Sequence, residues 1–425
     1  MKAQPPRKFV MSERIVSKRI PLLRGRWLAA LVATGLIAAV ACGSEADSPG
    51  SAVDGSLGAD LLLAEDRELP PAVPTAAPVL DAGGLIVNKN GPELIGNQLW
   101  FNSEPTSIGQ LAADGRVVLI DFWTYTCINC IRTFPFLREW DQKYRDRGLT
   151  ILGVHSPEFD FEKIPDNVQN AIDRYDLQYP TVQDNEMKTW NAFSNQFWPA
   201  KYLFNTDGEI TYTHFGEGEY IDTERQIRGA LEAAGYDISD IPIGTDEGLQ
   251  RDPLATGQTR ELYGGYDRNF TYAGLYAGQP EYYDSADTEA LYLDNLPHRD
   301  GQWYVQGVWK NTGEAIVHTR DTVEYEDYLV FKFLARSVVV VIDPQTPGAE
   351  FDVIIEVDGK PIRRADAGED IEYDDDGRSF IRVDRGKEYK VLEQQESTQR
   401  EMKLLTNSAD FAFFAATFGN NLDGA

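Results

Sequence analysis

Cysteine and histidine are scarce in this chain of 425 residues, which contains three cysteines and four histidines. A structural zinc site takes four such ligands, yet only Cys127 and Cys130 lie close together, while Cys42 and the histidines are scattered. The acidic stretch 372–377 resembles a calcium loop, but its twelfth position would be Val383 where that loop has glutamate. We therefore expect no metal site.

Basic residues are also few, because 40 Lys and Arg face 68 Asp and Glu, which gives a formal net charge of -28. The first 42 residues hold eight of the basic residues and a single Glu, so the rest of the chain is more acidic still. The acidic part of the chain after residue 42 repels phosphate groups, which argues against nucleic acid as a partner. A solvated surface that resists aggregation is the simpler meaning of the acidic excess.

No apolar run reaches the roughly 20 residues that a transmembrane helix needs. The largely apolar stretch 27–41 follows eight Lys and Arg residues and ends in small residues before Cys42, an order typical of an export signal. Residues 39–42 resemble a bacterial lipobox, whose cysteine becomes the lipidated N-terminus, although Ala39 stands where that pattern prefers Leu. Ordinary signal cleavage would instead leave Cys42 as a free thiol. Both alternatives place the body outside the cytoplasm, where disulfides form, and the first anchors it to the cell membrane.

Aromatic residues are absent from residues 43–84, so this stretch cannot bury enough surface to fold alone. A flexible tether of about 40 residues reaches roughly 35 Å. The predicted organisation is a signal peptide (1–42), a linker (43–84), a first folded domain (85–240), a polar bridge (241–257) and a second folded domain (258–425).

The Cys127-Ile-Asn-Cys130 pair lies where a predicted buried strand, 117–123, meets a predicted helix, 131–147. A helix N-terminus carries free N–H groups and partial positive charge, which favours a thiolate at Cys127. One sulfur can then attack a disulfide and the other can resolve the mixed disulfide. A purely structural disulfide here would close almost no loop and add little stability.

The first folded domain alternates strands and helices, which indicates an α/β sheet. Further strands are predicted at 150–155, 201–204 and 209–214, and further helices at 164–175, 186–193 and 223–234. Five segments of this domain, taken in order, resemble thioredoxin-fold proteins of the TlpA/ResA branch, and more closely the soluble region of DipZ-type proteins. They are residues 92–96, 121–133, 153–159, 196–200 and 215–220.

This resemblance implies a thioredoxin fold with a redox-active Cys127–Cys130 disulfide and no other cofactor. It also implies that Pro199 is a cis proline facing the cysteines, where the sequence alone would favour a trans turn proline. A cis Pro199 would hold the backbone of Trp198 where a substrate strand can pair beside the sulfurs. Trp123 is a further candidate for substrate contact, although a role in the core is equally compatible with a tryptophan.

Asp121 lies in an otherwise apolar strand, six residues before Cys127. In thioredoxins the acid at the matching position moves protons to and from the second cysteine. A carboxyl buried among apolar groups has a raised pKa and can act as a base for Cys130. The alternative is a solvent-facing Asp at the end of a strand.

The second folded domain consists of short β-type runs separated by turn residues, which favours an all-β sandwich. Residues 261–265, the region of Trp309, and residues 357–359 and 415–419 resemble the jelly-roll C-terminal domain of DipZ-type proteins. That domain is similar to a carbohydrate-binding module, so the resemblance suggests a glycan ligand. The predicted strands are 303–309, 315–320, 329–334, 337–342, 351–357, 380–383, 388–392 and 411–418.

Together these features predict an exported thiol–disulfide oxidoreductase that reduces or exchanges protein disulfides, with cytochrome c maturation as a family-based role. A separate membrane electron donor is then expected as a partner. One alternative is an envelope glycan-binding protein with a secondary redox domain. Another is a peroxiredoxin-like peroxide reductase, since Thr124-x-x-Cys127 matches part of that pattern, but Ile120 occupies its proline position.

Overall fold

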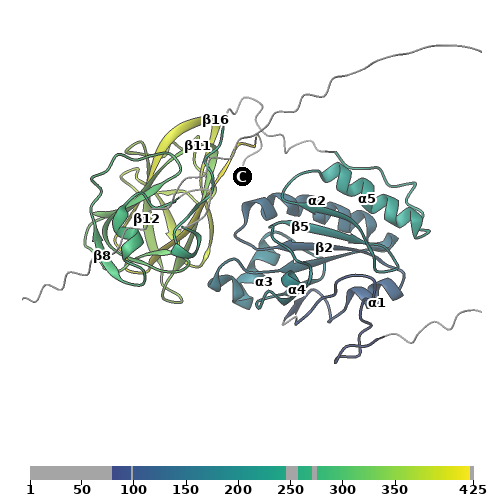
Figure 1. Cartoon of the computed structure of the whole chain (residues 1–425). Coiled ribbons are helices and arrows are strands. Elements are labelled where there is room, and N and C mark those ends of the chain that lie inside the picture. Colours follow the sequence, from purple (N-terminus) through teal and green to yellow (C-terminus); the bar gives the residue numbers. More distant parts are fainter. Residues whose placement is uncertain (1–78, 97–98, 246–256, 270–274, 422–425) are drawn as a thin grey trace, which may run out of the picture. The chain divides into compact units, whose positions relative to one another are not determined.

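The computed structural model describes residues 79–96, 99–245, 257–269 and 275–421. The predicted signal peptide with Cys42, and most of the linker and the bridge, lie outside the described residues. Two sheets organise the chain: a six-stranded sheet in the order β1-β4-β3-β2-β5-β6 and a second sheet of eleven strands (Figure 1). Within the described ranges, no helix combines the length and apolar character needed to cross a membrane.

The first domain has the mixed sheet and flanking helices of a thioredoxin fold, as predicted. Strands β2, β3 and β4 are parallel, and β5 and β6 continue the sheet antiparallel. Its elements are β1 (Trp100–Phe101), α1 (Ile108–Ala113), β2 (Val117–Trp123), α2 (Ile128–Tyr144), β3 (Leu149–His155), α3 (Pro165–Arg174), β4 (Thr181–Gln183), α4 (Lys188–Ala192), β5 (Ala200–Phe204), β6 (Ile210–Phe215) and α5 (Tyr220–Ala233). The sequence did not predict β1, α1 or β4, which are too short to show a clear periodicity.

Strand β2 is the centre of this domain and is buried along its whole length. Its alternate side chains enter two separate apolar clusters, since successive residues of a strand face opposite sides. Val117 and Leu119 face α2, α3 and α5, while Val118 and Ile120 face α1 and α4. Figure 1 shows α2 and α5 on one side of the sheet and α1 and α4 on the other. Asp121 has the parity of Leu119 and therefore belongs to the α2 side.

The second domain is the predicted all-β sandwich, and its named strands pair antiparallel throughout. Strand β11 is central because it pairs with β16, β17 and β9. The strands of the second domain are β7 (Leu262–Tyr263), β8 (Glu289–Tyr292), β9 (Trp303–Asn311), β10 (Ile316–His318), β11 (Asp327–Pro344), β12 (Phe351–Val357), β13 (Lys360–Pro361), β14 (Glu372–Tyr373), β15 (Ser379–Val383), β16 (Lys387–Thr406) and β17 (Phe411–Gly419).

Two predicted strands, 329–334 and 337–342, are one continuous strand, β11, which corrects the sequence-based division. The pairing with β16 shifts register between Ala335 and Ser337 and again between Val338 and Val339. Such irregularities interrupt the alternation of buried and exposed side chains, so the pattern appears as two short strands. Strand β16 likewise extends far beyond the predicted 388–392.

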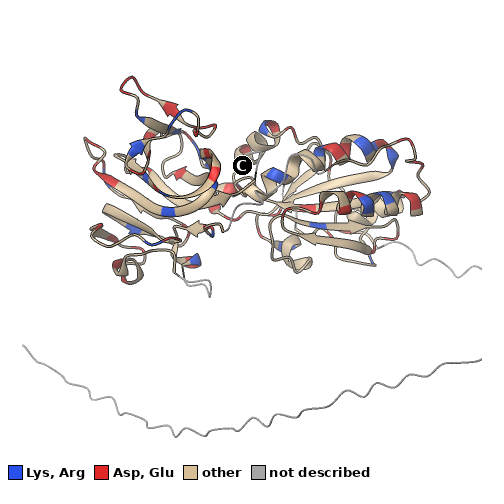
Figure 2. Cartoon of the chain, turned by 90° about the horizontal axis from the view of Figure 1, so that it is seen from above, with Lys and Arg blue, Asp and Glu red and all other residues tan. Residues whose placement is uncertain are grey.

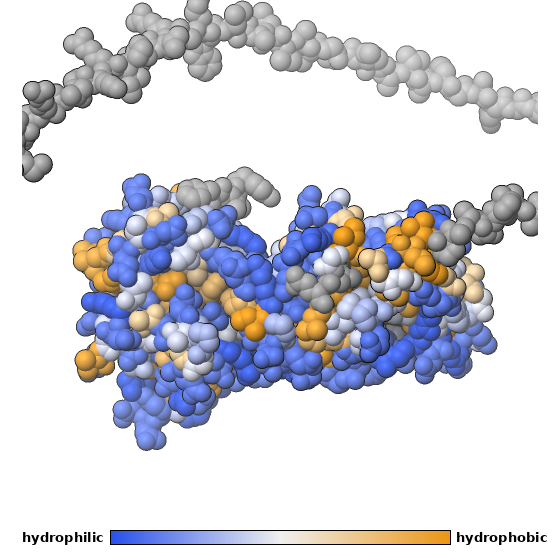
Figure 3. Space-filling view, turned by 90° about the horizontal axis from the view of Figure 1, so that it is seen from below, coloured by the Kyte–Doolittle hydropathy of each residue, from blue (hydrophilic) through white to orange (hydrophobic). Residues whose placement is uncertain are grey.

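The surfaces of both domains carry mixed charges. Figure 2 shows Lys and Arg interspersed with Asp and Glu, notably along the helices of the first domain. The face seen in Figure 3 is mostly hydrophilic and has separate apolar patches. Exposed apolar side chains of the first domain include Phe197 and Phe215, whose rings pack with centroids 5.3 Å apart.

Side chains of both domains share one apolar cluster. Phe414 of β17 packs against Phe159 and Phe161, which follow β3, with ring centroids 5.1 and 4.8 Å apart. All three side chains are buried. The segment after β3 is therefore part of the packing of both domains.

Candidate redox site

Cys127 and Cys130 lie at the start of α2, at the C-terminal end of the central strand. Cys127 is the N-cap residue, with extended backbone (φ −75°, ψ 108°), and the helix begins at Ile128. The sequence placed that start at Ile131, because the apolar periodicity becomes regular only beyond Cys130. Cys127 is half-buried and Cys130 is fully buried, and both are free thiols in this structure. Only the first sulfur is therefore placed to meet a large substrate.

Burial raises the pKa of the Cys130 thiol well above its ordinary value. The adjacent Cys127, which is within hydrogen-bonding reach, and the charge of Asp121 raise this pKa further. A thiol in this environment keeps its proton unless a neighbouring base accepts it. Cys130 therefore requires a proton acceptor before it can act as a nucleophile.

Asp121 is fully buried on the α2 side of the sheet, which excludes the solvent-facing alternative. Burial raises the pKa of its carboxyl to about 6, and the positive charge of Lys201 opposes this rise. Lys201 is the residue opposite Asp121 in the β2–β5 pairing, and its Nζ lies 3.7 Å from Asp121 Oδ1. Both side chains are completely shielded from solvent. A carboxyl with this pKa can accept a proton near neutrality.

Lys201 was not among the site residues predicted from the sequence. The available signal was a cation two residues after Pro199, within an otherwise apolar strand. A charge buried in this way needs a partner, but only the strand pairing identifies that partner as Asp121.

The peptide bond between Trp198 and Pro199 is cis, as the resemblance implied. The indole Nε1 of Trp198 donates a hydrogen bond of 2.9 Å to the carbonyl oxygen of Ser156, and its ring packs against Trp190 with centroids 4.2 Å apart. These contacts fix the backbone immediately before β5. Trp198 itself remains partly exposed.

Trp123 has a different environment, because its ring is completely buried. It packs edge-to-face against Phe134 of α2 and against His155 of β3, with centroids 5.3 and 4.8 Å apart. The side chain therefore supports the core beneath the cysteines. A ring buried in this way does not favour the substrate contact that the sequence also suggested for Trp123.

The loop that precedes Cys127 is held by a glutamate that the sequence analysis did not identify. Glu162 is fully buried, and its Oε1 accepts hydrogen bonds from Thr126 Oγ1 (2.6 Å) and from the Thr126 N–H (3.4 Å). Burial raises the pKa of Glu162 to about 7, and these hydrogen bonds oppose the rise. Glu162 lies outside the segments that carry the family resemblance, so no motif pointed to it.

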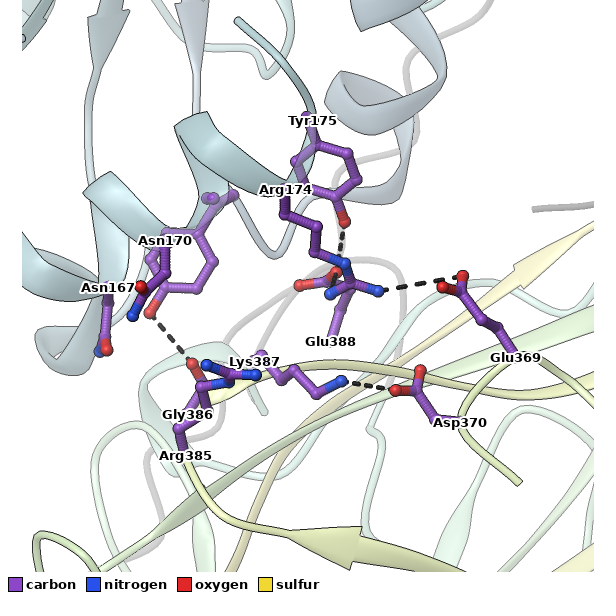
Figure 4. Close-up of a pocket in the computed structure, with 12 residues that line it drawn as sticks. Asn167, Asn170, Arg174, Tyr175, Glu369, Asp370, Arg385, Gly386, Lys387 and Glu388 are labelled. Atoms are coloured by element: carbon purple, nitrogen blue, oxygen red, sulfur yellow. Dashed lines mark hydrogen bonds and ion pairs between the residues drawn. The ribbon is translucent and has the colours of Figure 1, made fainter. Parts of the chain in front are cut away.

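A cleft of about 300 Å³ lies between α3 and the β16 region of the second domain. Figure 4 shows Arg174, the last residue of α3, and the following Tyr175 pointing toward Glu388, and Lys387 pointing toward Asp370. Arg174 Nη1 lies 2.7 Å from Glu388 Oε1, and Lys387 Nζ lies 2.5 Å from Asp370 Oδ1. The pair of Arg174 and Glu388 joins the two domains. Because the opposite charges that line the cleft pair with each other, little charge remains to recognise a ligand.

Comparisons with known proteins found matches to both folded domains. Residues 96–231 match the family model described as Redoxin, and residues 259–419 match the Thioredoxin like C-terminal domain. Protein DipZ of Mycobacterium bovis is 42% identical over 146 residues, which are 34% of this chain and 21% of DipZ. Thiol-disulfide oxidoreductase YkuV of Bacillus subtilis is 29% identical over 33% of this chain and 93% of YkuV. Thiol-disulfide oxidoreductase ResA of Bacillus cereus is 27% identical over 28% of this chain and 63% of ResA.

The aligned segment thus spans only about a fifth of DipZ. The redoxin match extends across both the cysteine pair and the cis-proline segment. Residues 96–231 are therefore a redoxin domain of the thioredoxin type, residues 259–419 are a thioredoxin-like C-terminal domain, and the predicted relationship to DipZ and the TlpA/ResA branch of thiol–disulfide oxidoreductases is confirmed.

Proposed function

We propose that the chain is an exported thiol–disulfide oxidoreductase that exchanges disulfides with other proteins through Cys127 and Cys130. The observation that carries the proposal is the unequal exposure of two neighbouring thiols at the start of α2. Cys127 is half-buried at the helix N-cap, whereas Cys130 is fully buried within its reach. An attacking thiol must meet the substrate, and a resolving thiol must not.

The reaction that this arrangement supports begins when the Cys127 thiolate attacks one sulfur of a substrate disulfide. The substrate S–S bond breaks, one substrate sulfur leaves as a thiolate, and a mixed disulfide forms with Cys127. Cys130 then loses its proton to Asp121 and attacks the Cys127 sulfur. The second substrate thiolate leaves, two electrons have passed to the substrate, and the chain holds a Cys127–Cys130 disulfide. The same steps in reverse oxidise a substrate dithiol.

Trp198 and Pro199 form the proposed binding site for the substrate backbone. The indole hydrogen bond to Ser156 and the packing of the Trp198 ring on Trp190 hold this backbone in place, so an extended substrate segment can pair with it beside Cys127. The exposed rings of Phe197 and Phe215 provide apolar surface next to the same segment. The substrate class is therefore an extended protein segment that contains a disulfide.

The cellular setting belongs to the same proposal. Cys42 would be lipidated and anchor the mature protein to the cell membrane, and a separate membrane protein would supply electrons for repeated reduction. The cysteines of apocytochrome c are the family-based substrate candidate. Mass spectrometry of the mature N-terminus tests the anchor: we expect a diacylated Cys42, and an unmodified Cys42 or a retained signal peptide would contradict it.

The central test uses the variants Cys127→Ser and Cys130→Ser with an oxidised protein substrate. We expect Cys130→Ser to accumulate a covalent complex through Cys127, because no second thiol resolves it. Cys127→Ser should form none, because the first attack is lost. Non-reducing electrophoresis and mass spectrometry measure both outcomes. A complex formed only by Cys127→Ser would reverse the assignment, and the absence of any disulfide in either variant or the parent would refute the redox function.

A further inference from the structure

The segment between Glu158 and Glu162 lies between the cysteine loop and the second domain. On one side, Glu162 Oε1 holds Thr126, the residue before Cys127. Its other oxygen, Oε2, accepts hydrogen bonds from the backbone N–H groups of Glu158 (2.5 Å) and Phe159 (3.0 Å). One buried carboxyl therefore ties this segment directly to the attacking end of α2.

The side chain of Glu158 points the other way, toward the second domain. Its carboxyl forms an ion pair with Arg268 and accepts a hydrogen bond of 3.1 Å from the hydroxyl of Tyr263. The guanidinium of Arg268 also lies over the Tyr263 ring, 4.6 Å from its centroid. The Glu158 side chain is only 9% exposed, so its charge would be expensive to leave without these partners.

Further contacts hold the residues between the two glutamates. The N–H of Asp160 donates a hydrogen bond of 3.0 Å to Glu314 Oε2, and Phe159 and Phe161 pack against Phe414. Every residue from 158 to 161 thus contacts a residue of the second domain. The position of this segment, and with it the position of Glu162, depends on that domain.

We propose that Arg268 and Tyr263 of the second domain are positioning residues for Cys127, acting through Glu158, Glu162 and Thr126. The inference rests on the proposed disulfide exchange at Cys127 and gives the second domain a part in it. Without Arg268, the buried Glu158 carboxyl lacks its counter-charge and moves toward water, which displaces the backbone that Glu162 binds. Thr126 then loses its fixed partner, and the Cys127 sulfur is no longer held in one orientation for attack.

The test is a double-mutant cycle in the full-length Cys130→Ser protein, which stops after the first attack. The variants are Arg268→Met, Thr126→Val and both together, and the measured quantity is the rate of mixed-disulfide formation with an oxidised protein substrate. We expect each single substitution to lower this rate by about fivefold. The double variant should be no slower than the slower single variant, because both substitutions disrupt the same series of contacts from Arg268 to Thr126.

Two conservative variants and one control separate positioning from general stability. Arg268→Lys retains the charge and Thr126→Ser retains the hydroxyl, so both should recover most of the rate. Arg382→Met removes a more exposed ion pair elsewhere on the sandwich, with Asp352, and should leave the rate unchanged. Circular dichroism and melting confirm that each variant is folded, and Tyr263→Phe replaces Arg268→Met in the cycle if the latter is not.

The outcomes are distinguishable. Equal rates for Arg268→Met and the Cys130→Ser parent, or effects that simply multiply in the double variant, would overturn the inference and leave the proposed exchange intact. A Cys130→Ser parent that forms no mixed disulfide at all would overturn the proposed function, and the positioning role with it.

Discussion

Asp121 and Cys130 are both buried, and in the proposed reaction the titration of the Asp121 carboxyl sets when the second thiol can react. The raised pKa of about 6 means that Asp121 is ionised at neutral pH and protonated in mild acid. Only the ionised carboxyl can accept the Cys130 proton. We therefore expect the decay of the mixed disulfide to slow as the pH falls through about 6.

The variant Asp121→Asn tests this role, because the amide cannot accept the proton. We expect resolution to slow by about 10- to 100-fold at neutral pH and to lose the pH dependence near 6. The first attack by Cys127 should change far less. Rapid-mixing measurements of formation and decay of the mixed disulfide in buffers on both sides of neutrality separate the two steps, and equal slowing of both would contradict the assignment.

Lys201 gives a second prediction for the same pair of buried charges. Its positive charge lowers the pKa of Asp121 against the effect of burial. Lys201→Met removes that charge with a side chain of similar length, so the pKa of Asp121 should rise and the midpoint for resolution should move to higher pH. Lys188→Met, at an exposed ion pair with Glu186, is the matched control and should leave the midpoint in place. A midpoint that moves downward in Lys201→Met would contradict the proposed pairing.

Among the strands, the close approach of β3 to its neighbours depends on Gly153. A Cβ at this position would lie 2.9 Å from Trp123 Nε1, 2.9 Å from Thr181 Oγ1 and 3.1 Å from Tyr179. Overpacking of this kind costs about 1 to 3 kcal/mol. We expect Gly153→Ala to lower the free energy of unfolding by that amount, as measured by denaturant titration.

Gly229 in α5 is the control for this substitution. Apart from the backbone of its own helix, no atom of the described residues would lie within 4 Å of a Cβ added there. Alanine is favoured over glycine inside a helix by about 1 kcal/mol. Gly229→Ala should therefore raise the free energy of unfolding slightly, and a loss comparable to that of Gly153→Ala would contradict the packing argument.

The two folded domains of the chain are predicted from the sequence to be separable, and the structure adds contacts between them. A fragment of residues 79–245 retains the six-stranded sheet, but it exposes Phe159 and Phe161, which Phe414 covers in the full chain. We expect the fragment to fold, to unfold at a lower denaturant concentration, and to exchange amide hydrogens faster at residues 158–162. Equal protection of this segment in the fragment and the full chain would show that the second domain does not hold it.

Local sequence patterns were sufficient to place the cysteine pair between a strand and a helix, and to predict the order of most elements of the first domain. Apolar periodicity and the position of Cys127 at a helix start are properties of neighbouring residues, so they can be recognised without the fold. The same patterns indicated the all-β second domain, although the register shifts in β11 concealed one long strand as two short ones.

The partners of the buried charges, in contrast, emerge only when the chain is folded. Lys201 meets Asp121 because β2 and β5 pair in one register. Glu162 meets Thr126 across 36 residues, and Arg268 meets Glu158 across 110 residues, because the chain folds back on itself. A buried charge requires a partner wherever the fold supplies one, and sequence spacing does not show which residue that is.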